Sequence, residues 1–157
     1  MFKFQQADPN NNWTDRNTCV PRALALATKT DYDTVFLACK DAGRPYRRGM
    51  FQDQINRALQ TLTNDPCTKL VHAPVHAPVQ GKYVEVTTRR SRYYGGTETR
   101  WQSLAPTFAQ FAASNPVGRF IVLRKGHAVA LINGTFLDSA ARTCGPRARV
   151  TAWCRVA

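Results

Sequence analysis

Residues 15–27 read DRNTCVPRALALA, a polar run that reaches a cysteine and passes at once into an alanine- and leucine-rich stretch. The apolar spacing predicts a helix over about residues 20–28. Asn17 or Thr18 can cap the free backbone N–H groups at its start. Cys19 then lies at a helix N-terminus, where the dipole favours the thiolate, which is the nucleophilic form of cysteine. The alternative is a buried cysteine that happens to start a helix.

A second stretch, residues 118–138, adds a histidine and a carboxylate. Asn133-Gly134 is a strong hairpin signal, and Lys125-Gly126 marks another turn. Before, between and after these two turns, apolar, β-prone runs predict three strands, over residues 120–123, 127–132 and 135–137. His127 opens the second strand and Asp138 ends the third, so an antiparallel arrangement brings the two side chains close together.

This order of residues resembles the papain-like cysteine peptidase superfamily, in which the nucleophile begins a central helix and the base and its orienting residue follow on sheet strands. The similarity is nearest to short phage and bacterial proteins of that superfamily and covers most of the chain, weakly between residues 65 and 100. The matching positions are Asn17, Cys19, Val20, Arg22, Ala23, Ala27, Thr28, Tyr32, Val35, Gly126, His127, Ala130, Gly134 and Asp138.

The resemblance implies an α+β fold in papain-like form, with N-terminal helices packed on a mostly antiparallel C-terminal sheet. It implies Cys19 as nucleophile, His127 as acid and base, and Asp138 as the residue that orients the imidazole. Asn133 is a rival for that third role. Papain-like enzymes carry a glutamine before the cysteine for the oxyanion hole, and here Trp13 occupies that place beside Asn12. Either Asn12 or Asn17 substitutes for it, or the hole is incomplete.

The implied activity is thiol acyl transfer on a protein or peptide substrate. The bond can be a peptide bond, an isopeptide bond to a ubiquitin-like tag, or a glutamine amide, so peptidase, isopeptidase and amidase remain open. The rival interpretation is a catalytically idle papain-like protein with a structural or binding role, such as a basic phage virion component or a nucleic-acid-associated protein. No cofactor is expected for either function.

Length and composition suit one domain over residues 1–157, with enough apolar residues for a core. The chain has no run long enough to span a membrane and no signal-peptide pattern at its start. We therefore expect a cytoplasmic protein, in the host cytoplasm or the virion if phage-encoded. The five cysteines match no metal-binding spacing. Cys39 is expected in the core, and Cys144 and Cys154 can pair only under oxidation.

The formal net charge is +12, with arginine well in excess of lysine. Such a charge attracts nucleic acid or acidic partners, although arginine-rich composition can also follow from a GC-rich genome. Two loops, residues 44–49 and 89–96, hold most of the clustered arginines, and we expect both at the surface. The second mixes arginine with tyrosine, a combination that can bind phosphate and stack on bases.

The remaining pattern predicts helices over residues 32–41 and 51–62, with Phe51, Ile55, Leu59 and Leu62 along one apolar face of the latter. A fourth helix is expected from Ser103 or Ala105 to about Asn115. Short or β-like segments complete the domain, namely residues 2–4, residues 67–88 with a strand at 83–86, and an edge strand over 148–156.

A four-residue repeat places His72 and His76 close together in residues 71–79. Its two prolines prevent a helix, and no third ligand is evident, so we expect no metal site there.

Overall fold

The computed structural model describes residues 2–9, 17–46, 48–73, 77–78, 101–102, 105–139 and 145–157. The chain divides into two compact units, one formed by residues 1–73 and 106–157 and the other by residues 74–105. In the second unit, β3 (Ala77–Pro78) pairs antiparallel with β4 (Trp101–Gln102). The single-domain organisation stays a prediction.

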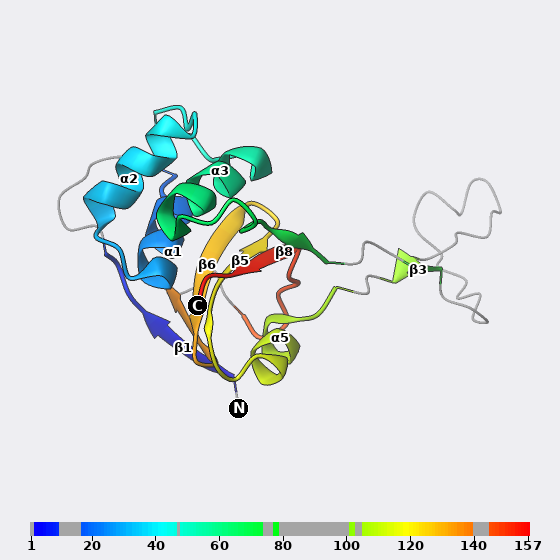
Figure 1. The fold of residues 1–157 in the computed structure, drawn as a ribbon. Coiled ribbons are helices and arrows are strands. Elements are labelled where there is room, and N and C mark those ends of the chain that lie inside the picture. Colours follow the sequence, from blue (N-terminus) through cyan, green and yellow to red (C-terminus); the bar gives the residue numbers. More distant parts are fainter. Residues whose placement is uncertain are drawn as a thin grey trace. The chain divides into compact units, whose positions relative to one another are not determined.

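The first unit is a mixed α+β structure built on a six-stranded sheet (Figure 1). The strands are β1 (Lys3–Gln6), β2 (Val71–His72), β5 (Arg119–Arg124), β6 (His127–Ile132), β7 (Thr135–Asp138) and β8 (Ala152–Arg155). Their order across the sheet is β1-β7-β6-β5-β8-β2. Only the β1–β7 pair is parallel among the described pairs.

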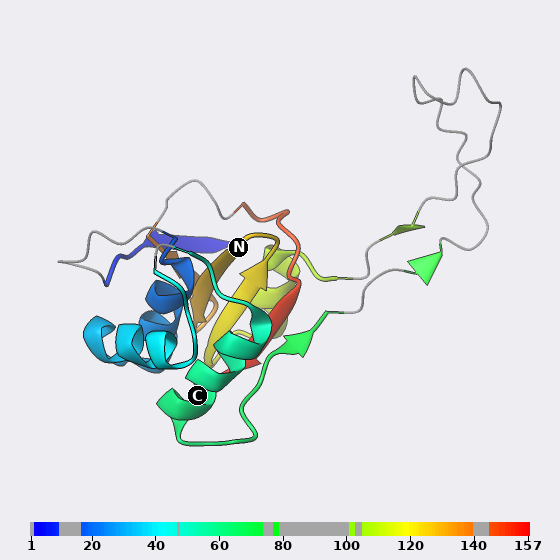
Figure 2. The same ribbon diagram turned by 90° about the horizontal axis from the view of Figure 1, so that it is seen from above.

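Helices cover the two faces of this sheet, as Figure 2 shows from above. On one side lie α1 (Cys19–Thr28), α2 (Tyr32–Asp41) and α3 (Gln52–Thr63), and on the other lies α5 (Phe108–Ser114). Alternate residues of a strand point to opposite faces. Accordingly Ile121 and Leu123 join the core under α1, while Phe120 and Val122 join the core under α5.

The helix that begins at Cys19 packs directly on the central strands β5 and β6. Its positions Ala23, Leu24 and Ala27 are almost fully buried, and the small alanines allow the helix to lie close to the sheet. Two further helices, α2 and α3, pack against α1. Helix α1 is therefore held between the sheet and two helices.

Several local predictions are confirmed. The helix over residues 32–41 has the predicted bounds, and the Asp31 carboxylate caps it by accepting a hydrogen bond of 2.9 Å from the Thr34 N–H. The three central strands follow the predicted ranges closely. Asn133 adopts the left-handed conformation, with φ of 46°, that its turn requires. Cys39 is fully buried in the core.

Other predictions are wrong about where a helix or strand begins and ends, or about which elements lie beside it. The fourth helix does not start at Ser103 or Ala105: α5 begins at Phe108, because Thr107 and Gln110 form a reciprocal capping box. Phe51 is not buried; it is the N-cap of α3 and 74% exposed. The strand within 148–156 is shorter, and β8 is no edge strand, because it lies between β5 and β2.

The prediction that both arginine-rich loops lie at the surface is wrong for Arg44, which is only 6% exposed. Its guanidinium lies 5.4 Å from the centre of the Phe36 ring and donates a 3.4 Å hydrogen bond to the Asn17 carbonyl. Arg48 is exposed as expected. The loop at residues 89–96, the predicted strand at 83–86, and His76 and Cys144 lie outside the described residues.

Candidate active site

Cys19 is the first residue of α1, one position earlier than the sequence pattern indicated. The turn before it is set by Asn17, whose φ of 57° is left-handed, and by the hydrogen bond from Arg44 to its carbonyl. Thr18 occupies the N-cap position and is buried, but its side chain makes no capping hydrogen bond, so Thr18 does not supply the predicted side-chain cap. The Thr18 carbonyl accepts the first helical bond, from the Arg22 N–H at 3.0 Å.

His127 is placed by the tight turn between β5 and β6. Residues Arg124 and His127 are directly paired across this turn, and Gly126 takes the left-handed conformation, with φ of 74°, that closes it. His127 is therefore the first residue of β6, at the sheet end where α1 begins its packing against β6.

Asp138 is the last residue of β7 and its side chain is only 3% exposed. Continuing the β6–β7 register sets Asp138 opposite Val129, two residues along from His127 and on the same face. The carboxylate oxygen Oδ2 lies 2.6 Å from His127 Nε2, a length typical of a strong, charge-assisted hydrogen bond. The sequence spacing thus predicted this contact correctly.

The imidazole also reaches the Cys19 thiol. Burial alone would raise the pKa of Cys19, but a hydrogen bond from the His127 side chain, the backbone N–H groups of Ala128 and Val20, and the positive charge of His127 together lower it below its ordinary value. Because Asp138 holds Nε2, Nδ1 is the ring nitrogen left to share a proton with the sulfur. Cys19, His127 and Asp138 thus form a continuous chain of polar contacts.

The other described cysteines have different surroundings. Burial raises the pKa of Cys39 to about 12, with the positive charge of Arg44 opposing that rise. Burial also raises the pKa of Cys154, the Asp65 carboxylate adding to it and the Lys69 N–H opposing it. Cys67 is an exposed free thiol. Cys19 is the described thiol whose pKa is lowered, so its surroundings favour the thiolate.

Strand β1 and α1 together fix the end of β7 that carries Asp138. Gln6 pairs with Asp138 in the parallel ladder, and the Ala7 N–H donates a 2.8 Å hydrogen bond to the Asp138 carbonyl. On α1, Arg22 donates a 3.3 Å bond to the Ser139 hydroxyl and forms an ion pair of 3.1 Å with Asp8. Sequence reasoning assigned Arg22 no role, although its place one turn after Cys19 was available as a signal.

The structure separates Asn133 from the histidine–carboxylate pair. Its Oδ1 accepts a 3.1 Å hydrogen bond from the Gly118 N–H, at the opposite end of β6 from His127. Asn17 lies two residues before Cys19, where its carbonyl is held by Arg44. Asn12 and Trp13 lie outside the described residues. Asn133 is therefore no rival of Asp138 as the partner of His127.

A cleft of about 490 Å³ opens beside the thiol and the imidazole, a size within the range of small-molecule and peptide-residue sites. Its walls include Cys19, His127, Leu123, Ile55 and Met50. The cleft thus joins a buried apolar wall to the polar contact chain.

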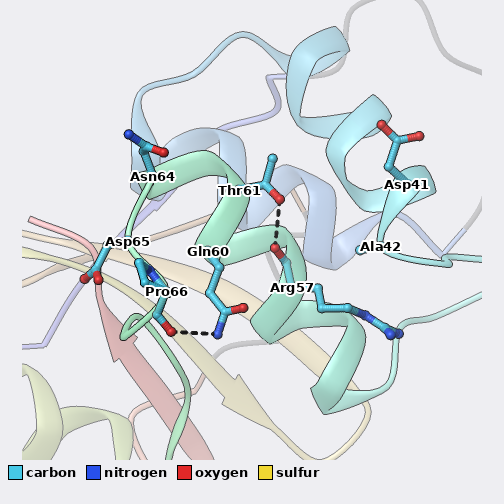
Figure 3. Close-up of a pocket in the computed structure, with 8 residues that line it drawn as sticks. All are labelled: Asp41, Ala42, Arg57, Gln60, Thr61, Asn64, Asp65 and Pro66. Carbon is cyan, nitrogen blue, oxygen red and sulfur yellow. Dashed lines mark hydrogen bonds between the residues drawn. The ribbon is translucent and has the colours of Figure 1, made fainter.

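A second cavity, of about 440 Å³, lies between α2 and the end of α3 (Figure 3). Its side chains are engaged locally: Gln60 donates a 3.1 Å hydrogen bond to the Pro66 carbonyl, and Thr61 bonds the Arg57 carbonyl. No cysteine or histidine is among the described residues that line it. The cleft beside Cys19 is the better candidate for chemistry.

Within the described ranges, no three histidine, cysteine, aspartate or glutamate side chains gather closely enough to hold a metal ion. Among the described helices, none combines the length and apolar character needed to cross a bilayer. Comparison with protein-family models, curated proteins and solved structures finds no match to this chain.

Proposed function

We propose that this protein is a papain-like cysteine hydrolase that acts by thiol acyl transfer. The observation that carries the proposal is the contact chain in which a buried carboxylate holds an imidazole at 2.6 Å and the imidazole lowers the pKa of a thiol. Perturbed titratable groups that converge in a cleft are typical of functional sites. If His127 and Asp138 had only a structural role and Cys19 were an inert thiol, the fold would not require this chain of contacts.

In the first half-reaction, the Cys19 thiolate attacks a carbonyl carbon and forms a C–S bond. The resulting tetrahedral oxyanion collapses, the bond from carbon to the leaving nitrogen or oxygen breaks, and the His127 imidazolium gives its proton to the leaving group. The product is a thioester on Cys19. Asp138 keeps the ring in the orientation that presents Nδ1 to the sulfur and stabilises the imidazolium while it exists.

In the second half-reaction, neutral His127 takes a proton from water as the oxygen attacks the thioester carbon. The C–S bond then breaks, which releases the carboxylic acid and returns the thiolate–imidazolium pair. The developing oxyanion needs N–H donors in both halves. The first N–H groups of a helix lack intrahelical acceptors, so the backbone N–H of Cys19 suits this role, aided by Asn17 or Asn12.

The papain-like assignment rests on the order and placement of these elements. A helix that begins at the cysteine packs on a sheet, and the histidine and carboxylate follow on adjacent antiparallel strands of it. We propose a protein or peptide substrate, with peptidase, isopeptidase and amidase activities as the candidates. Acyl transfer by Cys19, His127 and Asp138 needs no cofactor.

The alternative, a catalytically idle papain-like protein that binds nucleic acid or acidic partners, is favoured by the net charge of +12. It offers no reason for a thiol with a lowered pKa. The alternative predicts that Cys19 reacts no faster than an ordinary buried cysteine.

The proposal is tested by treating the protein with substoichiometric iodoacetamide at pH 6 and mapping the label by peptide mass spectrometry. We expect the label at Cys19, because the thiolate is the reactive form and the pKa of Cys39 and Cys154 is raised. Preferential labelling of any other cysteine, including Cys67 or Cys144, would contradict the assignment of the nucleophile.

Turnover is tested with an activated ester such as a p-nitrophenyl acyl ester, whose acyl group transfers to a reactive thiol. We expect a burst of p-nitrophenol equal to the amount of protein, followed by slower release as the thioester hydrolyses. Cys19→Ala should abolish the burst, whereas Cys67→Ala, the change of an exposed free thiol, should leave it intact. A burst that survives Cys19→Ala would refute the proposal.

A further inference from the structure

We propose that the cleft beside Cys19 selects acidic substrates, in which a carboxylate lies within a few bonds of the carbonyl that is attacked. This inference rests on the proposed function, since it names the substrate class of the same site. It arises from two positively charged residues at the cleft, for which the proposed roles of Cys19 and His127 give no reason.

Two cations stand at the cleft, Arg124 at the end of β5 and Lys125 in the following turn. Arg124 is paired in register with His127, so its backbone lies about 5 Å from that of the histidine. Lys125 is exposed and lies two residues before His127. Because the turn is short, both residues therefore lie on the side of the cleft that carries the base.

No carboxylate of the described residues lines the cleft beside these two cations. Among the described residues that line the cleft, none is an aspartate or glutamate; besides Cys19, His127 and the two cations, the polar ones are Gln52 and Thr151. The Arg124 Nε is buried and has no hydrogen-bond partner among the described residues. Asp138, the acidic residue of the site, is not part of the lining and already bonds His127.

This arrangement has an electrostatic consequence for the reaction. A cation directly across from His127 opposes the formation of a second positive charge on the imidazole. An anionic group of the substrate, bound beside Arg124 and Lys125, would neutralise that repulsion as it binds. A fixed cationic rim with low-dielectric walls also raises the local concentration of anions.

The apolar side chains of the same cleft favour an apolar neighbour in the same substrate. Ile55 and Leu123 are buried core residues that reach the cleft, and Met50 is partly buried beside them. Met is unbranched and adapts to different shapes. The cleft therefore suits a peptide in which an acidic residue and an apolar residue flank the attacked carbonyl.

The test compares two alkylating probes of similar size, iodoacetate, which is anionic, and iodoacetamide, which is neutral. For each, the second-order rate at Cys19 is measured at low salt and divided by the rate for a neutral reference thiol, N-acetylcysteine amide. Coulomb's law gives the anion a roughly threefold advantage in water for each cation at a separation of about 7 Å. We expect the iodoacetate preference of Cys19 to be roughly tenfold above that of the reference thiol and to weaken with salt.

Charge-removing variants then locate the effect. Arg124→Gln and Lys125→Gln should each lower the ratio about threefold, and the double variant should lower it about ninefold. Lys29→Gln is the matched control, because Lys29 caps the far end of α1, about 15 Å along the helix from Cys19, so its loss should change the ratio by less than about twofold. Since the readout is a ratio of two rates at one thiol, a general change in thiol reactivity cancels.

A second arm uses two peptide aldehydes that differ only in Glu or Gln next to the aldehyde residue, each tested for protection of Cys19 from iodoacetamide. We expect the Glu peptide to protect at a severalfold lower concentration, and this preference to be lost in Lys125→Gln, an exposed position whose change does not threaten the fold.

Three results would overturn the inference: an iodoacetate ratio no higher than that of the reference thiol, a raised ratio that both variants leave unchanged, or aldehydes that protect equally. If Cys19 shows no selective reactivity even with iodoacetamide, the proposed function itself fails. The two failures are therefore distinguishable.

Discussion

Asp138→Ala removes the carboxylate whose Oδ2 lies 2.6 Å from His127 Nε2. A hydrogen bond to a charged group contributes about 1.5–3 kcal/mol, and the bond acts on the imidazolium that accompanies the Cys19 thiolate. Its loss should destabilise the thiolate–imidazolium pair by that amount. At about 1.4 kcal/mol per factor of ten, the thiolate fraction at a pH below the pKa should fall roughly 10- to 100-fold, so the pKa of Cys19 should rise.

The assay is the rate of Cys19 alkylation by iodoacetamide as a function of pH, with the label located by peptide mapping. The rate follows the thiolate fraction and falls as the pH falls through the pKa. The wild-type pKa is lowered, so the fall should occur below the ordinary thiol range. In Asp138→Ala it should move to higher pH, and in Asp138→Asn, which keeps a neutral acceptor, it should move less.

Asn133→Gly serves as the control, because glycine accepts the positive φ of that turn and Asn133 bonds Gly118 rather than His127. Its alkylation profile should match that of the wild type. Circular dichroism establishes that each variant is folded. An Asp138→Ala profile that coincides with the wild-type profile would refute the reasoning, since the carboxylate would then have no influence on the pair.

Arg44→Leu should lower the free energy of unfolding in urea by about 2–4 kcal/mol, because it removes the buried cation that contacts the Asn17 carbonyl and the Phe36 ring. The same change should slow Cys19 alkylation, because Arg44 holds the turn before Cys19. An unchanged alkylation rate would contradict this positioning role. Thr107→Ala should lower that free energy by about 1 kcal/mol through loss of the capping box, with Cys19 alkylation unaffected. Replacement of three arginines by serine should flatten the salt dependence of binding to a random DNA duplex in an anisotropy titration, while Cys19→Ala should not change it; absence of binding at low salt would exclude the nucleic-acid hypothesis. These arginines are Arg89, Arg90 and Arg92.

Local patterns in the sequence predicted the parts of the protein whose structure depends on near neighbours. The hairpin positions followed from Asn133-Gly134 and Lys125-Gly126, because left-handed turn residues fix both the turn and the register of the strands beside it. That register brought His127 and Asp138 together. The helix at Cys19 followed in the same way from its apolar spacing.

Burial of individual side chains was harder to predict, because burial depends on what packs from elsewhere. Phe51 continues the apolar stripe of α3 by its spacing, yet it is the N-cap of that helix and its side chain is exposed. Arg44 belongs by composition to a basic surface loop, yet it is buried against Phe36 and the turn that precedes Cys19. Neither outcome has a signal in the neighbouring residues.

The sequence by itself determined a helix that begins at a cysteine and a three-stranded meander that pairs a histidine with a carboxylate. Only the tertiary structure decided that β1 joins β7 in parallel and anchors the end that carries Asp138, that β8 lies inside the sheet, and that the thiol meets the imidazole. The physical reason is the sequence separation over which each kind of interaction acts. Turn geometry and helix periodicity act within a few residues, whereas these contacts join segments from 29 to 132 residues apart, through backbone hydrogen bonds and apolar packing that any similar strand or helix can make.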